Sequence, residues 1–197
     1  MYKTLKRLSL SSIVIASFAL AGCQTPPNTI TFNPPAAVGP FNTQNQTSSV
    51  SVASRDLRAN QAVSQYTNNG QLFPVYAQPS VAELFQQSLQ QDLNSKGFRV
   101  LPGNAPANVT VNIKQFYANV NQGNVRYKVD ASVQLTIQVQ SAKGEYSKNI
   151  ETRRSQEGAF TAKTEEIQKV LGQAFDDAVK EIHQDQEVAN AINRLSH

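Results

Sequence analysis

The chain has 197 residues, of which 40% are hydrophobic and 16% are charged, which suits one domain with its own core. The formal net charge is +4, but the first 22 residues hold three of the 18 Lys and Arg residues and no acid. The remaining 15 basic and 14 acidic residues nearly balance, which excludes a nucleic-acid-binding protein driven by charge.

The first 22 residues have the three parts of a secretory signal peptide. Lys3, Lys6 and Arg7 form a positive start, an apolar stretch follows over residues 8–21, and small residues lead to Cys23. The apolar stretch is shorter than the roughly 20 apolar residues that span a bilayer. We therefore predict a cleaved signal peptide over residues 1–22.

The segment Leu20-Ala21-Gly22-Cys23 resembles the lipobox of bacterial lipoproteins. The resemblance implies cleavage between Gly22 and Cys23 and lipid attachment at the Cys23 thiol. The alternative is an ordinary signal peptide with a free cysteine. Two acyl chains already give a stable membrane anchor. In the lipoprotein family an aspartate directly after the cysteine tends to retain the protein in the inner membrane; here that residue is Gln24, so the resemblance implies sorting to the outer membrane with the protein facing the periplasm. Cys23 is the only cysteine, which leaves none for a disulfide.

Residues 23–47 are predicted to form the lipidated start and a flexible tether. No charged residue occurs from Gln24 to Ser54, and five prolines interrupt a segment rich in Asn, Thr, Gln and Ser. Within it, residues 29–32 have the pattern of a short extended piece that docks on the domain. The folded periplasmic domain is predicted to span residues 48–197.

The first half of that domain is predicted to contain short strands and one helix. Strands are expected over 49–53 and 71–76, with a hairpin turn at 68–70. Asp56, between Arg55 and Arg58, is either a surface ion pair or part of a binding site. Ser80 and Glu83 have capping-box spacing at the start of a helix that ends at Gly97. Its apolar stripe consists of Val81, Leu84, Phe85, Leu89 and Leu93.

The strongest periodic signal in the sequence runs over residues 124–139. Apolar and polar residues alternate strictly, which predicts a long strand with one buried and one wet face. Because of its length we expect a bend or bulge in it. Strands at 109–117 and 145–154 are expected on either side, with turns at 119–124 and 142–144, and the charges of the last strand favour an edge position.

Two more helical stretches follow these strands. Thr164 is expected to cap a helix with an extended apolar stripe up to Ile182, and a short helix is expected at 187–195. The elements together predict an α+β fold of two layers. In it, an antiparallel sheet of four to six strands with a long central hairpin is covered on one face by two amphipathic helices, and the other face is polar and open.

Two segments of the sequence resemble the YajG-type family of bacterial lipoproteins. They are Asn-Val-Asn-Gln-Gly-Asn-Val-Arg-Tyr at 119–127 and Glu-Gly-Ala-Phe at 157–160. The order of lipobox, tether, helix, long hairpin and C-terminal helix is also similar, although residues 60–78 match poorly. The resemblance implies an outer-membrane lipoprotein with this fold, and it carries over no catalytic residue.

An enzyme is the first class of function to weigh, and the chain lacks most of the groups that one needs. His183 and His197 are the only histidines, and neither a Gly-x-Ser-x-Gly elbow nor a histidine pair with metal spacing occurs. We therefore predict no catalytic residue, no metal and no cofactor. A hydrolase that uses carboxylates alone stays open, because distant acids can meet in a fold.

The second class is a binder of glycan, peptidoglycan or a small ligand, and the third is a binding module for a protein. Tyr117 and Tyr127 flank the 119–124 turn and are candidates for a ligand site, although the chain has no tryptophan and Tyr127 lies in the buried phase. We favour the third class, a non-catalytic binding or assembly module for an envelope protein. Its candidate surfaces are the turn, the wet sheet face and the charged edge strand. The candidate residues are Asn121, Gln122, Asn124, Arg126, Lys128, Arg153 and Arg154.

Overall fold

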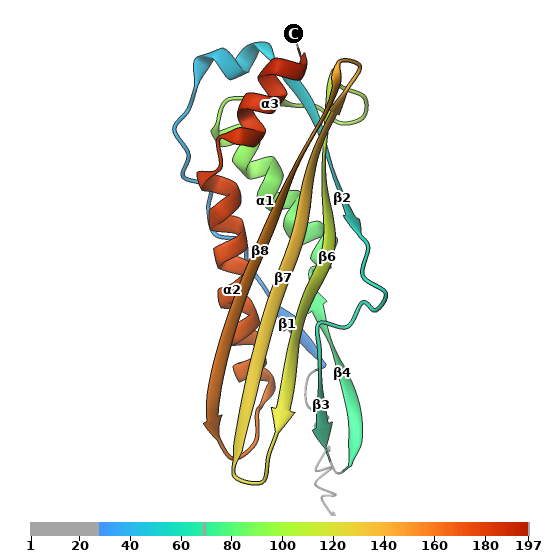
Figure 1. Cartoon of the computed structure of the whole chain (residues 1–197), viewed down its shortest axis with the longest axis vertical. Helices are drawn as coiled ribbons and strands as arrows, with labels where there is room; N and C mark the ends of the chain where they lie inside the picture. Colours follow the sequence, from blue (N-terminus) through green and yellow to red (C-terminus); the bar gives the residue numbers. More distant parts are fainter. Residues whose placement is uncertain (1–27, 69, 197) are drawn as a thin grey trace, which may run out of the picture.

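The computed structural model describes residues 28–68 and 70–196, and it packs three helices against one face of a twisted sheet (Figure 1). The predicted α+β class is confirmed. The predicted signal peptide, its cleavage site and the lipidated Cys23 lie outside the described residues. The elements are β1 (Thr29–Thr31), η1 (Thr43–Thr47), β2 (Ser49–Asp56), β3 (Ser64–Asn68), β4 (Gln71–Gln78), α1 (Val81–Ser95), β5 (Arg99–Val100), β6 (Ala107–Gln122), β7 (Arg126–Ser141), β8 (Gly144–Ala159), α2 (Thr164–Gln184) and α3 (Glu187–Ser196).

Three antiparallel strands of 16 residues each, β6, β7 and β8, form the long spine of the molecule (Figure 1). The alternation predicted for residues 124–139 is confirmed in β7, where every second residue from Tyr127 to Val139 is buried. The expected irregularity occurs in the neighbouring strand instead. The register of β6 shifts between Ile113 and Gln115, so β6 carries the bulge while β7 stays regular.

The sheet is mixed rather than antiparallel, and it has eight strands rather than four to six. β2 runs parallel to the first half of β6, and β3 pairs in parallel with the second half of β6. β5 also pairs in parallel with β2, and β1 pairs in parallel with β4. The reason is the connection between β2 and β6, which contains α1 and returns the chain to the same end of the sheet, as parallel pairing requires.

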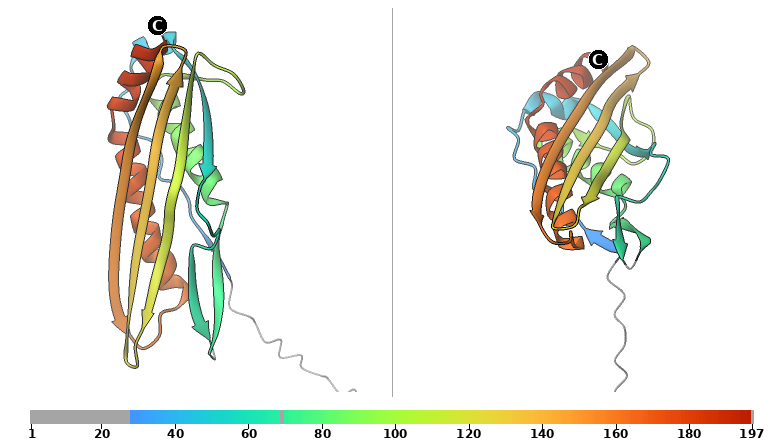
Figure 2. Two further views of the ribbon diagram at one scale, coloured as in Figure 1. Left: turned by 45° about the vertical axis from the view of Figure 1, so that its right-hand side comes forward. Right: turned by 60° about the horizontal axis from the view of Figure 1, so that its bottom comes forward.

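The three helices all cover the same face of the sheet (Figure 2). The predicted capping box of α1 is confirmed, since Glu83 N donates to Ser80 Oγ (3.3 Å) and Ser80 N donates to Glu83 Oε2 (2.9 Å). At α2 the predicted cap is wrong by one residue. Lys163 N donates to Glu166 Oε2 (2.9 Å), so Lys163 is the N-cap and Thr164 is the first helical residue.

Four phenylalanines meet between the sheet and the helices. Phe32 follows β1, Phe85 lies in α1, Phe116 in β6 and Phe175 in α2. Their ring centroids are 5.2–6.0 Å apart, mostly with edge-to-face geometry. Aromatic pairs in this geometry add about 0.5–1.5 kcal/mol beyond their burial. This cluster therefore joins the N-terminal segment to both layers.

The predicted boundary of the domain at residue 48 is too late. β1 pairs with β4, Gln168 Nε2 of α2 donates to Thr31 O (2.7 Å), and Phe32 is buried, so the prediction that residues 29–32 dock is confirmed. Further along, the buried Asn45 donates through Nδ2 to Lys96 O (2.7 Å). A flexible tether thus does not describe residues 28–47, and residues 23–27 lie outside the described part.

Candidate functional site

The polar side of β6, β7 and β8 faces away from all the described helices, and it holds three of the predicted site residues, Asn121, Lys128 and Arg153. The strand register lines up its side chains in rows across the three strands, for example Tyr117, Ser132 and Arg153. We name this surface the open face. It consists of Asn108, Thr110, Asn112, Gln115, Tyr117, Asn119 and Asn121 of β6, of Lys128, Asp130, Ser132, Gln134, Thr136, Gln138 and Gln140 of β7, and of Glu145, Ser147, Asn149, Glu151, Arg153, Ser155 and Glu157 of β8.

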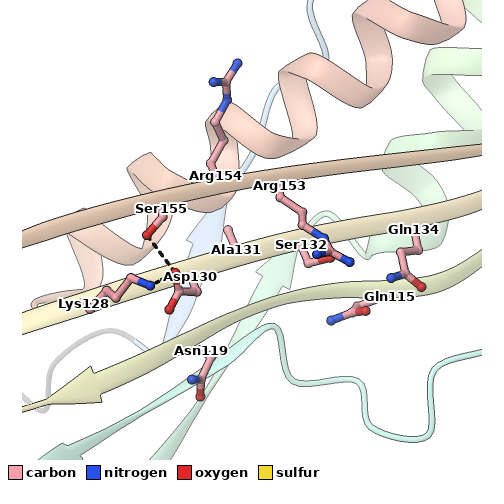
Figure 3. Close-up of a pocket in the computed structure, with 10 residues that line it drawn as sticks. All are labelled: Gln115, Asn119, Lys128, Asp130, Ala131, Ser132, Gln134, Arg153, Arg154 and Ser155. Atoms are coloured by element: carbon pink, nitrogen blue, oxygen red, sulfur yellow. Dashed lines mark hydrogen bonds and ion pairs between the residues drawn. The ribbon is translucent and has the colours of Figure 1, made fainter.

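A hollow of about 580 Å³ lies over the middle of the open face (Figure 3). At its edge Asp130 accepts hydrogen bonds from Lys128 Nζ (2.9 Å) and Ser155 Oγ (2.7 Å). The bond from Lys128, and then the bond from Ser155, lowers the pKa of Asp130, and Asp130 in turn raises the pKa of Lys128. Both groups are therefore charged at neutral pH, as a fixed ion pair on the surface.

Arg153 and Arg154 do not form one surface, which corrects the prediction that grouped them. Arg153 lies opposite Ser132, points onto the open face and pairs with Glu151. Arg154 lies opposite Ala131 and pairs with Asp177 of α2, so it belongs to the interface between sheet and helix. Figure 3 shows the two side chains leaving β8 in opposite directions.

The turn between β6 and β7 divides the other predicted residues. Asn121 lies opposite Lys128 on the open face, and Asn124 and Arg126 are exposed at the turn. Gln122 has a different role. Its Nε2 donates to Phe160 O (2.7 Å) and its Oε1 accepts from Ala162 N (3.2 Å), so its amide bridges two turns and is used inside the fold.

The two tyrosines considered for a ligand site lie in different environments. Tyr127 is buried and its ring covers Gly158, where an added Cβ atom would clash with the ring and the hydroxyl oxygen of Tyr127. The glycine in the Glu-Gly-Ala-Phe segment thus makes room for this ring. Tyr117 lies on the open face, half-buried, and burial raises the pKa of its hydroxyl.

Of the two alternatives for Asp56, a surface ion pair or part of a binding site, the structure shows an ion pair with Arg58, but this pair is largely buried and not on the surface. Arg58 Nη2 lies 2.7 Å from Asp56 Oδ2, and Arg58 Nη1 donates to Phe116 O (3.1 Å). The guanidinium thus joins the end of β2 to the middle of β6. Because these donors of Arg58 are used within the fold, we assign the Asp56–Arg58 pair to the stability of the fold and not to a binding site.

A second polar cluster lies inside the core, where the last turn of α1 meets the end of α2. Lys96 and Asp92 are each 2% exposed, and Lys96 Nζ donates to Asp92 Oδ2 (2.8 Å), Asp185 O (2.6 Å) and Ile182 O (3.2 Å). His183 is also buried, and burial, followed by the Lys96 charge, lowers its pKa. Because Asp92 and Lys96 are almost fully enclosed, we assign this cluster to stability and not to catalysis.

The titration of Asp92 leads to a prediction about pH. Burial raises the pKa of Asp92 from 3.8 to about 6, although the Lys96 charge opposes this shift. The folded state therefore binds the proton more tightly, and the stabilisation by protonation is full below 3.8 and lost as the pH rises through about 6. Between pH 7 and pH 5 the wild type should gain on the order of 1 kcal/mol of unfolding free energy relative to Asp92→Asn. Urea unfolding of both proteins at the two pH values measures this difference, and an unchanged difference would contradict the raised pKa.

Neither a metal site nor a membrane-spanning helix occurs in the part of the chain that the structure describes. No group of three or more His, Cys, Asp or Glu side chains there is arranged to hold a metal ion. No helix among the described residues combines the length and the apolar character needed to cross a membrane.

These features define the class of the protein as a two-layer α+β domain with one polar sheet face that no described helix covers. The chain belongs to a family described as "uncharacterized lipoprotein", whose model matches residues 34–193. It is 29% identical over 182 residues to the uncharacterized lipoprotein YajG of Escherichia coli K12, covering 92% of this chain and 94% of YajG. The YajG protein of E. coli O6:H1 gives the same values. The resemblance predicted from the sequence is thus confirmed.

Two solved structures have a similar fold. Protein XCC0632 of Xanthomonas campestris superposes with a TM-score of 0.57 at 10% identity, over 84% of this chain and 98% of that chain. A crystal structure of an uncharacterized protein gives a TM-score of 0.50 at 14% identity, over 81% and 99% of the two chains. At such low identity these likenesses concern the fold alone.

Proposed function

We propose that the protein is an outer-membrane lipoprotein, anchored through lipid on Cys23, that holds an envelope protein on its open face without catalysis. Membership of a lipoprotein family and the lipobox ending in Cys23 support the anchor. Gln24, directly after that cysteine, supports sorting to the outer membrane. The open face supports the binding role.

The observation that carries the binding role is the size and chemistry of the open face. With 16 residues in each of three strands, the face measures roughly 50 Å by 14 Å, or about 700 Å². One partner in a standard protein interface contributes about 800 Å². Amide and hydroxyl groups line the face and can donate to and accept from a protein laid on it.

A protein fits this face better than a glycan does. Sugar sites commonly offer an aromatic platform, but the chain has no tryptophan, Tyr127 is buried under the sheet, and Tyr117 is a single, half-buried aromatic ring among the residues of the open face. Lys128, Asp130, Glu151 and Arg153 are already in ion pairs, and apart from Glu145 and Glu157 the other groups on the open face are neutral and can form hydrogen bonds. The open face resembles the polar part of a protein interface in its chemistry.

Crosslinking in cells tests the binding role. Benzoylphenylalanine placed at Gln134, in the hollow, is expected to give one protein adduct of discrete mass after irradiation. The same group at Lys180, exposed on α2, is the matched control and is expected to give none. Equal adducts at both positions would contradict the assignment of the face. Adducts that contain only glycan would contradict a protein partner and favour the alternative function, binding of glycan or peptidoglycan.

The anchor is tested separately from the face. Cells grown with labelled palmitate are expected to transfer label to the wild type and not to Cys23→Ala. An unlabelled wild-type protein would remove the anchor from the proposal.

A further inference from the structure

Three exposed apolar side chains gather at one end of the molecule. Leu72 follows the β3–β4 turn, Val125 lies in the β6–β7 turn, and Phe160 lies just after β8; these residues are 64%, 70% and 78% exposed. Phe160 N donates to Val125 O (2.9 Å), and Leu72 lines a small pocket together with Gln122 and Thr161. We name these three residues the apolar tip. Figure 2 shows the three turns at the same end of the long strands.

The backbone at Phe160 departs from ordinary preference. Its φ is 68°, a left-handed conformation that is unfavourable for a bulky residue and natural for glycine. The Gln122 amide holds the segment in place by accepting from Ala162 N and donating to Phe160 O. The aromatic ring itself packs in no core, so its presence at this position costs stability without a gain in burial. An outlier of this kind points to a function for the side chain.

The charges at this end also suit a lipid surface. The three turns span residues 68–72, 122–126 and 159–163, and they contain Arg126 and Lys163; the nearest acidic residues in the sequence, Glu157 and Glu165, lie two residues outside the third turn. Apolar side chains flanked by cations are the usual composition of segments that enter the boundary between phospholipid headgroups and acyl chains.

The length of chain before the described residues places the anchor near the tip. Tyr76 N in β4 donates to Asn28 O (2.7 Å). From Tyr76 back to Gln71, at the start of β4, the strand covers about 17 Å. The chain from Cys23 to Asn28 has the same number of residues and reaches at most about 17 Å when fully extended. Lipid on Cys23 is thus close enough for the tip to meet the membrane.

The other end of the molecule is out of reach of the same surface. The turn between β7 and β8 lies one full strand away from the tip, which is about 50 Å for 16 residues. Asn28 pairs within the half of the molecule that contains the tip, so the short connection to Cys23 keeps this half at the membrane.

We propose that the apolar tip docks on the phospholipid surface that carries the Cys23 lipid, so that the long strands stand up from the membrane and present the open face to the periplasm. This inference rests on the lipid anchor proposed above. It adds a second, non-covalent membrane contact that fixes the orientation of the domain.

The test uses the full lipidated chain in vesicles of phosphatidylethanolamine and phosphatidylglycerol. Since Cys23 is the only cysteine, an added Asn124→Cys is the single thiol free for a polarity-sensitive nitrobenzoxadiazole label. Doxyl lipids are expected to quench this label at least threefold more than a label on Lys143→Cys in the distant β7–β8 turn. In the background of Asn124→Cys, the changes Leu72→Ser, Val125→Ser and Phe160→Gly together should abolish this excess.

The single change Phe160→Gly separates loss of docking from loss of folding. It is expected to raise Tm, because glycine accepts the left-handed backbone, and to lower the quenching of the label at position 124. Protein that floats with the vesicles without excess quenching at position 124 would overturn docking and leave the anchor intact. Protein that carries no lipid by mass spectrometry and does not float would overturn the proposed anchor, and the docking with it.

Discussion

Lys96→Met is expected to lower the free energy of unfolding by about 3–5 kcal/mol, the typical cost of removing one partner of a buried ion pair. The three protons of the Lys96 ammonium are all used, on Asp92 Oδ2 and on the main-chain oxygens of Ile182 and Asp185. Methionine fills a similar volume, so the loss reports mainly the unpaired carboxylate and carbonyls and not a cavity. Urea unfolding at pH 7, followed by circular dichroism, measures it.

Two further variants show whether the effect comes from the charge. Asp92→Leu combined with Lys96→Met removes both charges and should recover most of the loss, because well-packed apolar residues often replace a buried pair at little cost. Asp92→Leu alone leaves the ammonium buried without its carboxylate and should remain destabilised. If Lys96→Met stayed within about 1 kcal/mol of the wild type, the assignment of this cluster to stability would be wrong.

The position of this pair was within reach of sequence reasoning. Leu89, Asp92, Leu93 and Lys96 follow the spacing of one helical stripe, so the apolar phase of the helix includes two opposite charges four residues apart. An ion pair on a core-facing stripe is predicted to be buried. A stripe defined by its apolar residues alone does not include Asp92 and Lys96, so the pair is missed. The carbonyl partners of Lys96 come from α2 and could not be foreseen, because they are about 90 residues away in sequence.

Some features of the strands also follow from the local sequence, whereas others depend on segments that are distant in the sequence. The period of two in β7 is a local property, and it predicted both the buried and the open phase. The same alternation places Arg153 and Arg154 on opposite faces, so their separation was also available from sequence. The parallel pairing of β2 and β3 with β6 depends on how the connections cross the sheet, which short strand patterns do not encode. Likewise, the bridge made by Gln122 needs the knowledge that residues 160–162 lie beside its turn.

Phe32→Ala gives the second large effect that we expect, a loss of about 3–5 kcal/mol in unfolding free energy. The Phe32 ring is 4% exposed, and its centroid lies 5.4 Å from that of Phe116 and 6.0 Å from that of Phe175. In a flexible tether the same change would alter stability by less than about 0.5 kcal/mol. Phe41→Ala is the matched control, because Phe41 lies in the same segment but is 57% exposed, and it should cost far less.

The same variant connects the packing of the N-terminal segment to the orientation of the domain. Phe32 holds the chain that follows β1 against the core, and β1 keeps Cys23, the proposed site of the lipid, within about 17 Å of β4. If the segment before η1 detaches in Phe32→Ala, the connection to Cys23 lengthens and the apolar tip is no longer held at the membrane. Quenching of the label at position 124 should then fall although Leu72, Val125 and Phe160 are all unchanged. Full quenching in a destabilised Phe32→Ala protein would instead mean that the tip finds the membrane without help from a short connection.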